Sequence, residues 1–599
     1  MPLSKLFSAF YPKNEEAASE DIIEIQNEQS GDTKQPATDT ERDVSAGSSE
    51  APEERPDENA QEGVRNVEAI TLVWTKKSLI IVFASIWLMY FMNAFQASIT
   101  SNLTPFVLSD FASHSLVPVI GIASNVMAGA LRLAVSKMLD LWGRPQGVVV
   151  MTTIATLSLV LMAVCTNVQT YAAAQVFYSI GFDGYIYTCD VITSDSTNLK
   201  NRALAFAFTS SPYIITAFAG PTASEGFYEN ISWRWAFGTF CILTPIVAIP
   251  LFSTLTWNQR KAKKRGLITP RYSGRTLSQS IWFYIIEFDA LGVFLFAAGF
   301  SLFLLPFSLA ESAADQWRSA HIIVMLVLGV VLIAAFALCE RFVSPKPFLP
   351  FGLLLSPTVV GSCLLCASYQ VSYYCWASYF TSFLQVVNGL SIEDAGYVSS
   401  SFDVVSGVFV FFSGWLIRYT DRFKWILLIA VPLEILGQGL MIYFRQPHQN
   451  VGYIVMCQVF IAVSGGTIIL TQQISIQSVA KHGEVAATLA LLGLFGYIGG
   501  AVGNTISGAV WTNTLPGALQ KYLPASALPD WEDIYNDLDT QLSYPMGSPT
   551  REAIIKSYGL AQRNMCIAAT AVMGLCFVWV MMIKDVRLSK VNQTKGLVF

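Results

Sequence analysis

Apolar stretches of about 20 residues recur from residue 78 almost to the end of the chain, separated mostly by short polar segments. Because an α-helix rises about 1.5 Å per residue, such a stretch crosses the hydrocarbon core of a bilayer, which is about 30 Å thick. The pattern therefore predicts an all-α integral membrane protein with fourteen transmembrane helices. Their approximate ranges are 78–99, 116–136, 148–166, 170–190, 203–221, 235–256, 289–310, 320–339, 357–377, 397–417, 425–444, 451–471, 485–509 and 564–583.

Residues 1–70 lack this pattern and are rich in acidic residues, Ser, Gln and Pro. They contain 17 Asp and Glu but only 6 Lys and Arg, and no apolar segment with a small-residue cleavage site. This composition favours a disordered acidic tail over a signal peptide. In the whole chain 53% of residues are hydrophobic and 13% are charged, against about 25% charged in an ordinary soluble domain. A soluble enzyme, a secreted disulfide scaffold and a nucleic-acid-binding protein are thereby excluded.

The basic residues indicate how the chain is oriented. Most of the 37 Lys and Arg lie in the two tails and in the loops on one side of the predicted helices. Since basic residues accumulate on the cytoplasmic side, we expect both termini to be cytoplasmic. The longest outside loop is then 510–563, and loops of this length are often functional. Its candidate substrate contacts are Tyr535, Tyr544 and Tyr558. The sequons at Asn102 and Asn230 also fall outside, as candidate glycosylation sites.

Two cytoplasmic loops place an acidic residue at a helix exit beside basic residues. The loop after the second helix contains Asp140, Gly143 and Arg144, and the loop after the tenth contains Asp421 and Arg422. Their separation by eight helices predicts two six-helix halves, which are typical of secondary transporters that rock around a central site. The predicted segments are a cytoplasmic tail 1–70, an N-terminal half 71–256, a basic cytoplasmic loop 257–288, two interposed helices 289–339, a C-terminal half 340–583 and a cytoplasmic tail 584–599.

The first of these loops is similar to the inter-helix signature of the major facilitator superfamily, with Asp140, Gly143 and Arg144 in the matching positions. The chain also combines fourteen predicted helices, an acidic N-terminal tail and a long last outside loop. Together with the stretch from Gln175 to Asp190 and the segment 233–238, these features resemble the fungal siderophore-iron transporters. The resemblance covers nearly all of residues 70–590.

This resemblance implies that a monomer imports an intact ferric siderophore, driven by protons, at the plasma membrane or in endosomal vesicles. Two alternatives remain: a proton-coupled exporter of drugs or glutathione, and a non-transporting sensor of substrate. The sequence gives no sign of an enzyme or a cofactor, because it lacks a glycine-rich phosphate loop and a nucleophile elbow. The ten cysteines lie in apolar segments and the four histidines are far apart, so no protein-built metal site is expected.

Acidic residues inside predicted helices are the candidates for proton coupling, because a charge at mid-membrane costs about 2.5–3.5 kcal/mol on insertion scales. In the fourth helix Gln175, Ser179, Asp183, Tyr187 and Asp190 follow steps of three or four residues and share one face. We expect Asp183 to bind and release the coupling proton. The alternative is a structural salt bridge to a basic residue of the second helix, Arg132. The secondary candidates are Asp190, Asp403 and Glu434.

Polar and aromatic residues of the first, fourth and ninth helices are predicted to line a substrate pocket, although aromatic residues of membrane helices often only pack. The candidates are Tyr90, Asn93, Gln96, Gln175, Tyr187, Tyr369, Gln370, Tyr373 and Trp376. Arg132 is the only basic residue inside a predicted helix. Because an unpaired buried charge is costly, a trianionic ferric catecholate would require several basic residues. We therefore expect a neutral ferric hydroxamate of the ferrichrome or fusarinine type.

Overall fold

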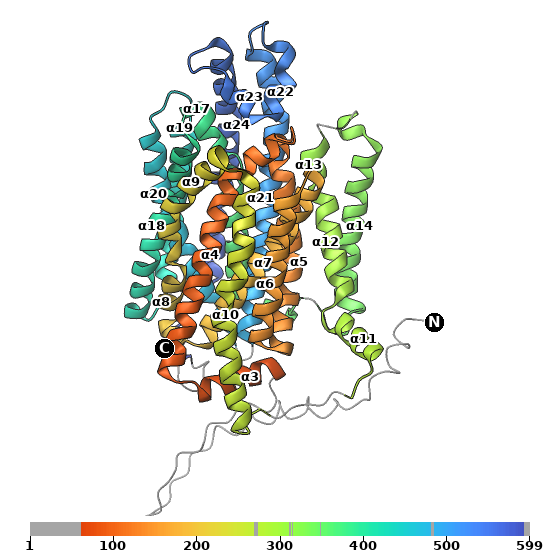
Figure 1. Ribbon diagram of the computed structural model, residues 1–599, viewed down its shortest axis with the longest axis vertical. Coiled ribbons are helices and arrows are strands. Elements are labelled where there is room, and N and C mark those ends of the chain that lie inside the picture. Colours follow the sequence, from red (N-terminus) through yellow and green to blue (C-terminus); the bar gives the residue numbers. More distant parts are fainter. Residues whose placement is uncertain are drawn as a thin grey trace, which may run out of the picture. The chain divides into compact units, whose positions relative to one another are not determined.

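The computed structural model describes residues 61–268, 274–310, 313, 315–347, 349–480 and 484–591. Across these residues the regular elements are α-helices joined by short turns and 3-10 segments (Figure 1). The prediction of a disordered tail falls mainly on residues 1–60, which lie outside the described residues. Its last part is wrong, because residues Glu62–Val73 form the helix α3.

The first group of long helices contains seven elements: α4 (Lys76–Ser109), α5 (Val117–Trp142), α6 (Arg144–Val164), α7 (Val168–Asp195), α8 (Leu199–Ser210), α9 (Pro212–Asn230) and α10 (Trp233–Lys264). Within this group α6 packs on α7 and α10, and α4 packs on α9 and α10. The break between α8 and α9 falls at Ser211, immediately before Pro212. Proline has no N–H to donate to the preceding turn, which explains why one predicted helix is divided here.

The second group follows the same plan further along the chain: α15 (Phe351–Leu354), α16 (Pro357–Ala377), α17 (Phe380–Asn388), α18 (Ile392–Thr420), α19 (Lys424–Phe444), α20 (Val451–Gln477), α21 (Val485–Tyr522), α22 (Trp531–Asn536), α23 (Leu538–Ser543), α24 (Pro549–Met573) and α25 (Cys576–Met582). The two groups meet along two seams, in which α5 packs on α21 and α8 and α9 pack on α18. Any cavity between the groups is therefore bounded by these five helices and by those next to them.

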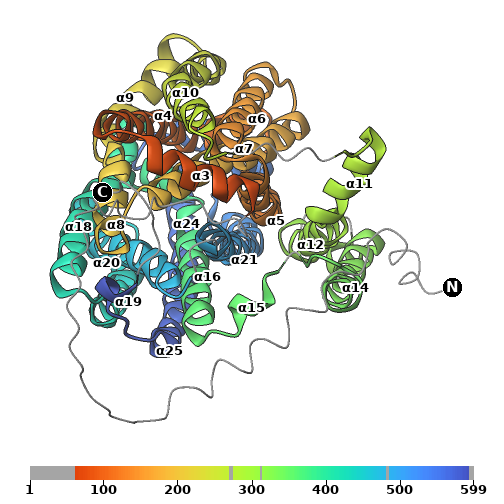
Figure 2. The same ribbon diagram turned by 90° about the horizontal axis from the view of Figure 1, so that it is seen from below.

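A third set lies beside the α5–α21 seam (Figures 1 and 2). It contains α11 (Leu277–Glu287), α12 (Ala290–Leu304), α13 (Pro306–Leu309) and α14 (Ala320–Phe342). Helices α12 and α14 pack mainly on each other, while α12 and α13 contact α5 and α21. The predicted basic loop 257–288 is wrong as a loop, because α10 extends to Lys264 and α11 fills most of its second half.

Small residues allow α21 to pack closely on its neighbours. A Cβ atom added at Gly499 would lie 2.3 Å from the backbone oxygen of Ala367, and one at Gly503 would lie 2.6 Å from that of Val371. Both contacts are with α16, so this helix and α21 approach each other backbone to backbone. Glycine is enriched at such contacts in membrane proteins because apolar lipid does not drive helices together and close packing has to do so.

Twelve helical segments of the described chain are long and apolar enough to cross a membrane. Of the fourteen predicted transmembrane helices, twelve are thus supported. The two other predicted spans correspond to α7 and α16, which have 28 and 21 residues but fall outside the apolar criterion. Both helices pack inside the bundle, α7 on α5 and α6 and α16 on α20, α21 and α24. A helix covered by other helices does not need an apolar surface all round, which explains why α7 and α16 carry polar residues within the bundle.

The predicted outside loop 510–563 is also wrong in its bounds. Helix α21 continues to Tyr522 and α24 begins at Pro549, so only residues 523–548 connect them, and these contain α22 and α23. We call the end of the bundle with α22 and α23 the α22 face. The opposite end is the α3 face, where α3 lies across α10 and α5 (Figures 1 and 2).

Candidate functional site

A cavity of about 620 Å³ lies between the two groups of helices. Its walls come from α4, α5, α7 and α9 of the first group and from α16, α17, α18 and α21 of the second. The lining extends from Asn93, Asp183 and Asp403 in the middle of their helices to Thr104 and Val117 near the α22 face. The cavity therefore occupies the half of the bundle towards the α22 face.

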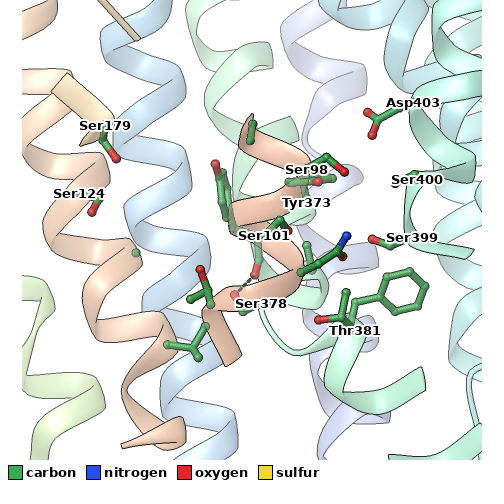
Figure 3. Close-up of a pocket in the computed structure, with 18 of the residues that line it drawn as sticks. Ser98, Ser101, Ser124, Ser179, Tyr373, Ser378, Thr381, Ser399, Ser400 and Asp403 are labelled. Atoms are coloured by element: carbon green, nitrogen blue, oxygen red, sulfur yellow. Dashed lines mark hydrogen bonds between the residues drawn. The ribbon is translucent and has the colours of Figure 1, made fainter. Parts of the chain in front are cut away.

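The cavity wall is rich in hydroxyl groups, which both helix groups supply (Figure 3). The hydroxyl residues of the wall include Ser98, Ser101, Ser124, Ser179, Thr216, Ser378, Thr381, Ser399 and Ser400. Neither lysine nor arginine occurs among the described residues that line it, whereas two carboxylates, Asp183 and Asp403, do. Such a wall suits a ligand that accepts and donates hydrogen bonds and does not carry a large negative charge.

Several buried polar atoms of this wall have no hydrogen-bond partner among the described residues. They are the hydroxyls of Ser98 and Ser124, the side-chain oxygen of Gln175 and the side-chain nitrogen of Asn504. Buried polar groups are normally paired with protein, water or a ligand. These atoms therefore mark positions where a solvent molecule or a bound substrate completes the site.

Six of the residues predicted for substrate binding or proton coupling line the cavity together. They are Asn93, Gln175, Asp183, Tyr373, Trp376 and Asp403. The Asn93 amide donates to the Tyr213 hydroxyl over 3.0 Å, and this tyrosine also lines the cavity. Tyr373 packs edge-on against Trp376, with 5.4 Å between ring centroids. The structure thus brings the predicted aromatic and amide residues of α4, α7 and α16 to one space.

Asp183 belongs to a cluster that connects the two helix groups, which we call the Asp183 cluster: Arg132, Asp183, Tyr187 and Tyr497. Tyr497 of α21 lies beside the Asp183 carboxylate of α7. The guanidinium of Arg132 donates to the Asp183 backbone oxygen over 3.0 Å, and its carbon lies 4.3 Å from the Tyr187 ring centroid. The alternative of a direct Arg132–Asp183 ion pair is not what the structure shows. The arginine binds the backbone instead.

Asp403 faces the same cavity from α18 in different surroundings. Its carboxylate makes no hydrogen bond or ion pair with the residues that the structure describes, and only its backbone oxygen accepts, from Ser406 at 3.3 Å. The acid is therefore free to interact with whatever occupies the cavity.

Two other predicted acids lie outside the cavity lining. Asp190 is 8% exposed and accepts a hydrogen bond from the Tyr90 hydroxyl. It lies about two turns after Asp183 on α7, closer to the α3 face. Glu434 of α19 is fully buried, accepts from Gln438 over 3.1 Å and binds the Ser464 hydroxyl of α20. Both carboxylates are thus held by neutral donors within their own helix group.

The remaining predicted pocket residues also lie behind the wall. Gln96 donates to Thr100 over 2.6 Å and accepts from Tyr178, while the Tyr187 hydroxyl donates to the Ala486 oxygen over 2.6 Å. Tyr369 is buried and Gln370 is half-buried, and neither is in the lining. These residues support the wall rather than form it.

Towards the α3 face the two groups are closed by charged hydrogen bonds. The fully buried guanidinium of Arg202 donates to the Gln477 side chain over 2.8 Å and to the Ser194 backbone oxygen over 3.0 Å. Because Gln477 ends α20 and Arg202 lies in α8, this contact crosses between the groups. Hydrogen bonds to charged groups contribute about 1.5–3 kcal/mol, about twice the neutral value.

Each of the two predicted loop motifs connects helices within its own half of the chain. Arg144 pairs with Asp140 at 3.0 Å and with Asp195 of α7 at 2.9 Å, and Gly143 between α5 and α6 has a φ of 100° that favours glycine. In the second loop Arg422 pairs with Asp585, and the Asp421 carboxylate accepts from the Ser589 N–H over 2.8 Å. Each loop therefore ties its helices to a segment that is distant in the sequence.

Towards the α22 face the connecting segment and α17 reach across to the first group. His114 Nε2 lies 3.0 Å from the Ser382 hydroxyl, the Ser115 hydroxyl donates to Asn536 over 2.9 Å, and the Tyr228 hydroxyl lies 3.1 Å from the Asp539 carboxylate. Of the predicted loop contacts, Tyr535 and Tyr544 pack against the buried apolar residues at this end of the bundle, which include Leu538 and Trp511. Tyr558 belongs to α24 instead, where it is fully buried and donates to Gln541 over 2.6 Å.

Two sequence predictions about single residues are wrong. Asn102 lies within α4, is 5% exposed and donates to Ser224 over 3.4 Å, so it cannot serve as a glycosylation acceptor in the folded chain. Asn230 is exposed at the end of α9 and stays a candidate. Arg132 is also not the only basic residue in the bundle, because Arg202 and Arg445 are fully buried. Neither of these two lines the cavity, so the wall remains free of basic residues.

Sequence reasoning missed the hydroxyl-rich wall and Tyr497. Serine and threonine are common in membrane helices, where they bond their own backbone one turn earlier, so each residue alone gives no signal. The glycines at 493, 496, 499 and 500 around Tyr497 were the available sign of a close contact. Indeed a Cβ atom at Gly493 would lie 2.8 Å from the Arg132 side chain.

Comparisons with known proteins agree with this architecture. The family model of the Major Facilitator Superfamily matches residues 86–504. The chain is 56% identical to "MFS siderochrome iron transporter D" of Aspergillus fumigatus, over 92% of each chain, and 49% identical to "Siderophore iron transporter mirB" of Emericella nidulans, over 95% of each. A bacterial homologue of the human lysosomal transporter Spinster, in an inward-facing and occupied conformation, has a similar fold, with a TM-score of 0.51 and 15% identity. That match covers 87% of this chain and 98% of the bacterial one.

Proposed function

The chain belongs to the Major Facilitator Superfamily and, within it, to the siderophore iron transporters, and from this premise we propose that it imports ferric siderophores through the cavity between its two helix groups. Transport proceeds by alternating access, in which the groups rock about the α5–α21 and α9–α18 seams. The cavity of about 620 Å³ falls within the usual range of small-molecule sites, about 300–1,000 Å³.

The observation that carries the substrate class is the absence of lysine and arginine from the described cavity wall, combined with two carboxylates in it. A trianionic ferric catecholate would bring three negative charges next to Asp183 and Asp403, and each unpaired buried charge is costly. A ferric trihydroxamate is neutral, because three hydroxamate anions balance the iron charge. Its carbonyl and amide groups match the hydroxyl and amide side chains of the wall. A neutral hydroxamate of the ferrichrome or fusarinine class is therefore the proposed cargo, and iron crosses as part of the chelate.

Protons supply the driving force in this proposal, and Asp183 is the principal coupling site. Its carboxylate borders the cavity, and its tyrosine partner belongs to the opposite helix group. A change in its protonation therefore alters a contact between the groups, which is what coupling requires. Asp403, Asp190 and Glu434 are secondary sites, because none of them makes such a contact between groups in the described residues.

The proposed orientation places the α3 face in the cytoplasm of a plasma-membrane protein. The α3 face carries the exposed basic residues at the end of α10, Arg260, Lys263, Lys264 and Arg265. Basic residues accumulate on the cytoplasmic side, so the cavity, which lies in the half of the bundle towards the α22 face, is on the outer side. In this arrangement α7 and α16 also cross the membrane, giving fourteen spans.

Uptake of a panel of iron-loaded siderophores tests the proposal. The chain is expressed in fungal cells that lack their own siderophore carriers, and radioactive iron is counted with and without a protonophore. We expect ferric hydroxamates to accumulate and the protonophore to abolish accumulation. Uptake of ferric catecholates without hydroxamate uptake would contradict the substrate class.

The same assay distinguishes the alternatives. Lower accumulation in expressing cells than in empty cells would indicate an exporter, and unchanged accumulation would indicate a sensor that does not transport. A matched control is the variant Asn230→Gln, which alters an exposed residue at the end of α9 away from the cavity and should transport normally if it reaches the membrane.

A further inference from the structure

Helix α11 leaves one apolar face uncovered. Leu277, Ile281 and Ile285 are spaced by four residues, and Trp282 lies next to them on the helix surface. Their exposed fractions are 81%, 54%, 43% and 50%, respectively. Ser278 is the single polar residue within this arc. An apolar strip of this kind on a helix is not stable against water without a partner.

The other side of α11 is held by the bundle. Tyr284 packs edge-on against Trp142 at the end of α5, with 5.7 Å between ring centroids. Glu287 is buried and forms an ion pair with Lys346, and its backbone oxygen accepts from Lys137 over 3.0 Å. A capping box between Thr276 and Gln279 fixes the start of the helix. The helix is thus anchored, and its exposed face has a defined direction.

The position of α11 places this face at the boundary of the membrane. Helix α12, which is part of a candidate membrane span, begins at Ala290, three residues after α11 ends. In Figure 1 α11 lies at the lower end of α12, at the level of the α3 face and outside the helix bundle. A helix at this level that turns an apolar strip away from the bundle meets the layer between headgroups and acyl chains.

The charges around this edge complement a phospholipid surface. Arg275 precedes α11 and Arg341 ends α14, and both are exposed. Lys346 is partly exposed beside them. The neighbouring acids are turned inward, with Glu287, Asp289 and Glu340 between 3% and 6% exposed. The charge presented to the surroundings here is therefore positive, as anionic lipid headgroups require.

We propose that α11 is an interfacial helix that lies on the bilayer at the α3 face, with Leu277, Ile281, Trp282 and Ile285 in the acyl boundary and Arg275 and Arg341 on lipid phosphates. Amphipathic helices of this type insert their apolar side about 5–10 Å into that boundary. The helix thereby fixes the position of the α12–α14 pair relative to the membrane. This inference rests on the chain being a membrane protein and is independent of its cargo.

Site-directed fluorescence in lipid nanodiscs tests the proposal with the full chain. The probe bimane is attached at Ile281→Cys on the exposed face or at Ser280→Cys, which lies on the side of Tyr284 and Glu287. The native cysteines are buried except for Cys241, which is half-buried and is replaced by Ala in both variants. Nanodiscs with one protein copy exclude contacts between copies.

We expect nitroxide-labelled lipid to quench the probe at 281 about threefold or more above the probe at 280, and aqueous iodide to show the reverse order. Equal quenching by lipid at both positions would overturn the proposal. Shielding of position 281 from both quenchers would also overturn it, because another part of the protein would then cover the face.

A second measurement tests the charge contribution. The double variant Arg275→Gln, Arg341→Gln leaves the buried ion pair of Glu287 intact. In the native background, raising phosphatidylserine from none to about one third of the lipid should increase lipid quenching at position 281, and the double variant should lose about half or more of that increase. An increase of the same size in the variant would remove these arginines from the lipid contact.

Discussion

Asp183 and Asp403 face one cavity from opposite walls, and their surroundings differ. Tyr497 of the opposite helix group lies beside the Asp183 carboxylate of α7, and Arg132 donates to the Asp183 backbone oxygen. Asp403 of α18 has no side-chain partner among the described residues. One acid is therefore part of the contact between the groups, while the other only borders the space between them.

The difference separates two tasks that a coupled transporter needs. A proton can drive a conformational change only if its binding energy differs between the two conformations. The Asp183 carboxylate satisfies this condition, since its partner moves with the other group when the groups rock. Asp403 lacks such a link and is suited to contact the cargo or water. The comparison thus predicts unequal effects of neutralising the two acids.

Asp183→Asn should have the largest effect. Because the amide cannot exchange a proton, accumulation against a concentration gradient should fall about tenfold or more, equivalent to ~1.4 kcal/mol or more of lost driving force. The measurement is the steady-state ratio of internal to external radioactive ferric hydroxamate. Asn230→Gln, at the exposed end of α9 and away from the cavity, is the control and should retain accumulation. Undiminished uphill accumulation by Asp183→Asn would remove this residue from the coupling mechanism.

Tyr497→Phe should have the next largest effect. It removes the hydroxyl group beside Asp183 but keeps the ring beside Arg132, whose guanidinium carbon lies 5.7 Å from the ring centroid. Because a hydrogen bond from this hydroxyl would stabilise the charged carboxylate by about 1.5–3 kcal/mol, we expect the pH dependence of uptake to shift and the rate to fall about fivefold. Initial uptake rates between pH 4 and pH 8 check this prediction. An unchanged pH profile would break the proposed link between Asp183 and the opposite group.

Asp403→Asn should change substrate binding more than coupling. Because the Asp403 carboxylate has no partner among the described residues, its replacement leaves the contact between the groups intact, so the accumulation ratio at saturating substrate should stay within about twofold of native. The apparent KM for the ferric hydroxamate should change about threefold. Loss of accumulation equal to that of Asp183→Asn would show that the two acids act as one coupled unit.

Glu434→Gln should have the smallest effect on transport. Glu434 is fully buried between α19 and α20, away from the cavity, and its neutral partners can also bind an amide. Uptake should therefore stay within about twofold of native when normalised to protein at the membrane. A loss of uptake with normal surface expression would place a second proton site in this half.

The sequence located the acids but not their surroundings. Asp183 was identifiable because an acid in the middle of an apolar helix is costly and shares a face with Gln175 and Tyr187. Its partner Tyr497 was not, since one tyrosine among glycines predicts close packing without naming the neighbour. For the same reason the different roles of Asp183 and Asp403 follow only from the structure.

The predicted helix boundaries are wrong where the apolar pattern stops before the helix does. Helices α21 and α24 continue beyond the apolar stretch into the α22 face, where polar and aromatic residues still pack on protein. Arg202 and Arg445 were assigned to loops for the same reason, because each lies at the edge of an apolar run. Hydropathy indicates whether a helix faces lipid and does not indicate whether it is buried against other helices. Helices α7 and α16, which are buried in the bundle and fall outside the apolar criterion, are further examples.

Purified protein in liposomes tests directly whether Asp183 couples uptake of the chelate to protons. A ferric hydroxamate is supplied outside, the external medium is made acidic relative to the interior, and radioactive iron inside is measured with native protein and with Asp183→Asn. Native protein should concentrate the chelate only while the pH gradient lasts, and the variant should only equilibrate it. Concentration of the chelate without a pH gradient, or equal concentration by the variant, would show that uptake is not driven by protons through Asp183.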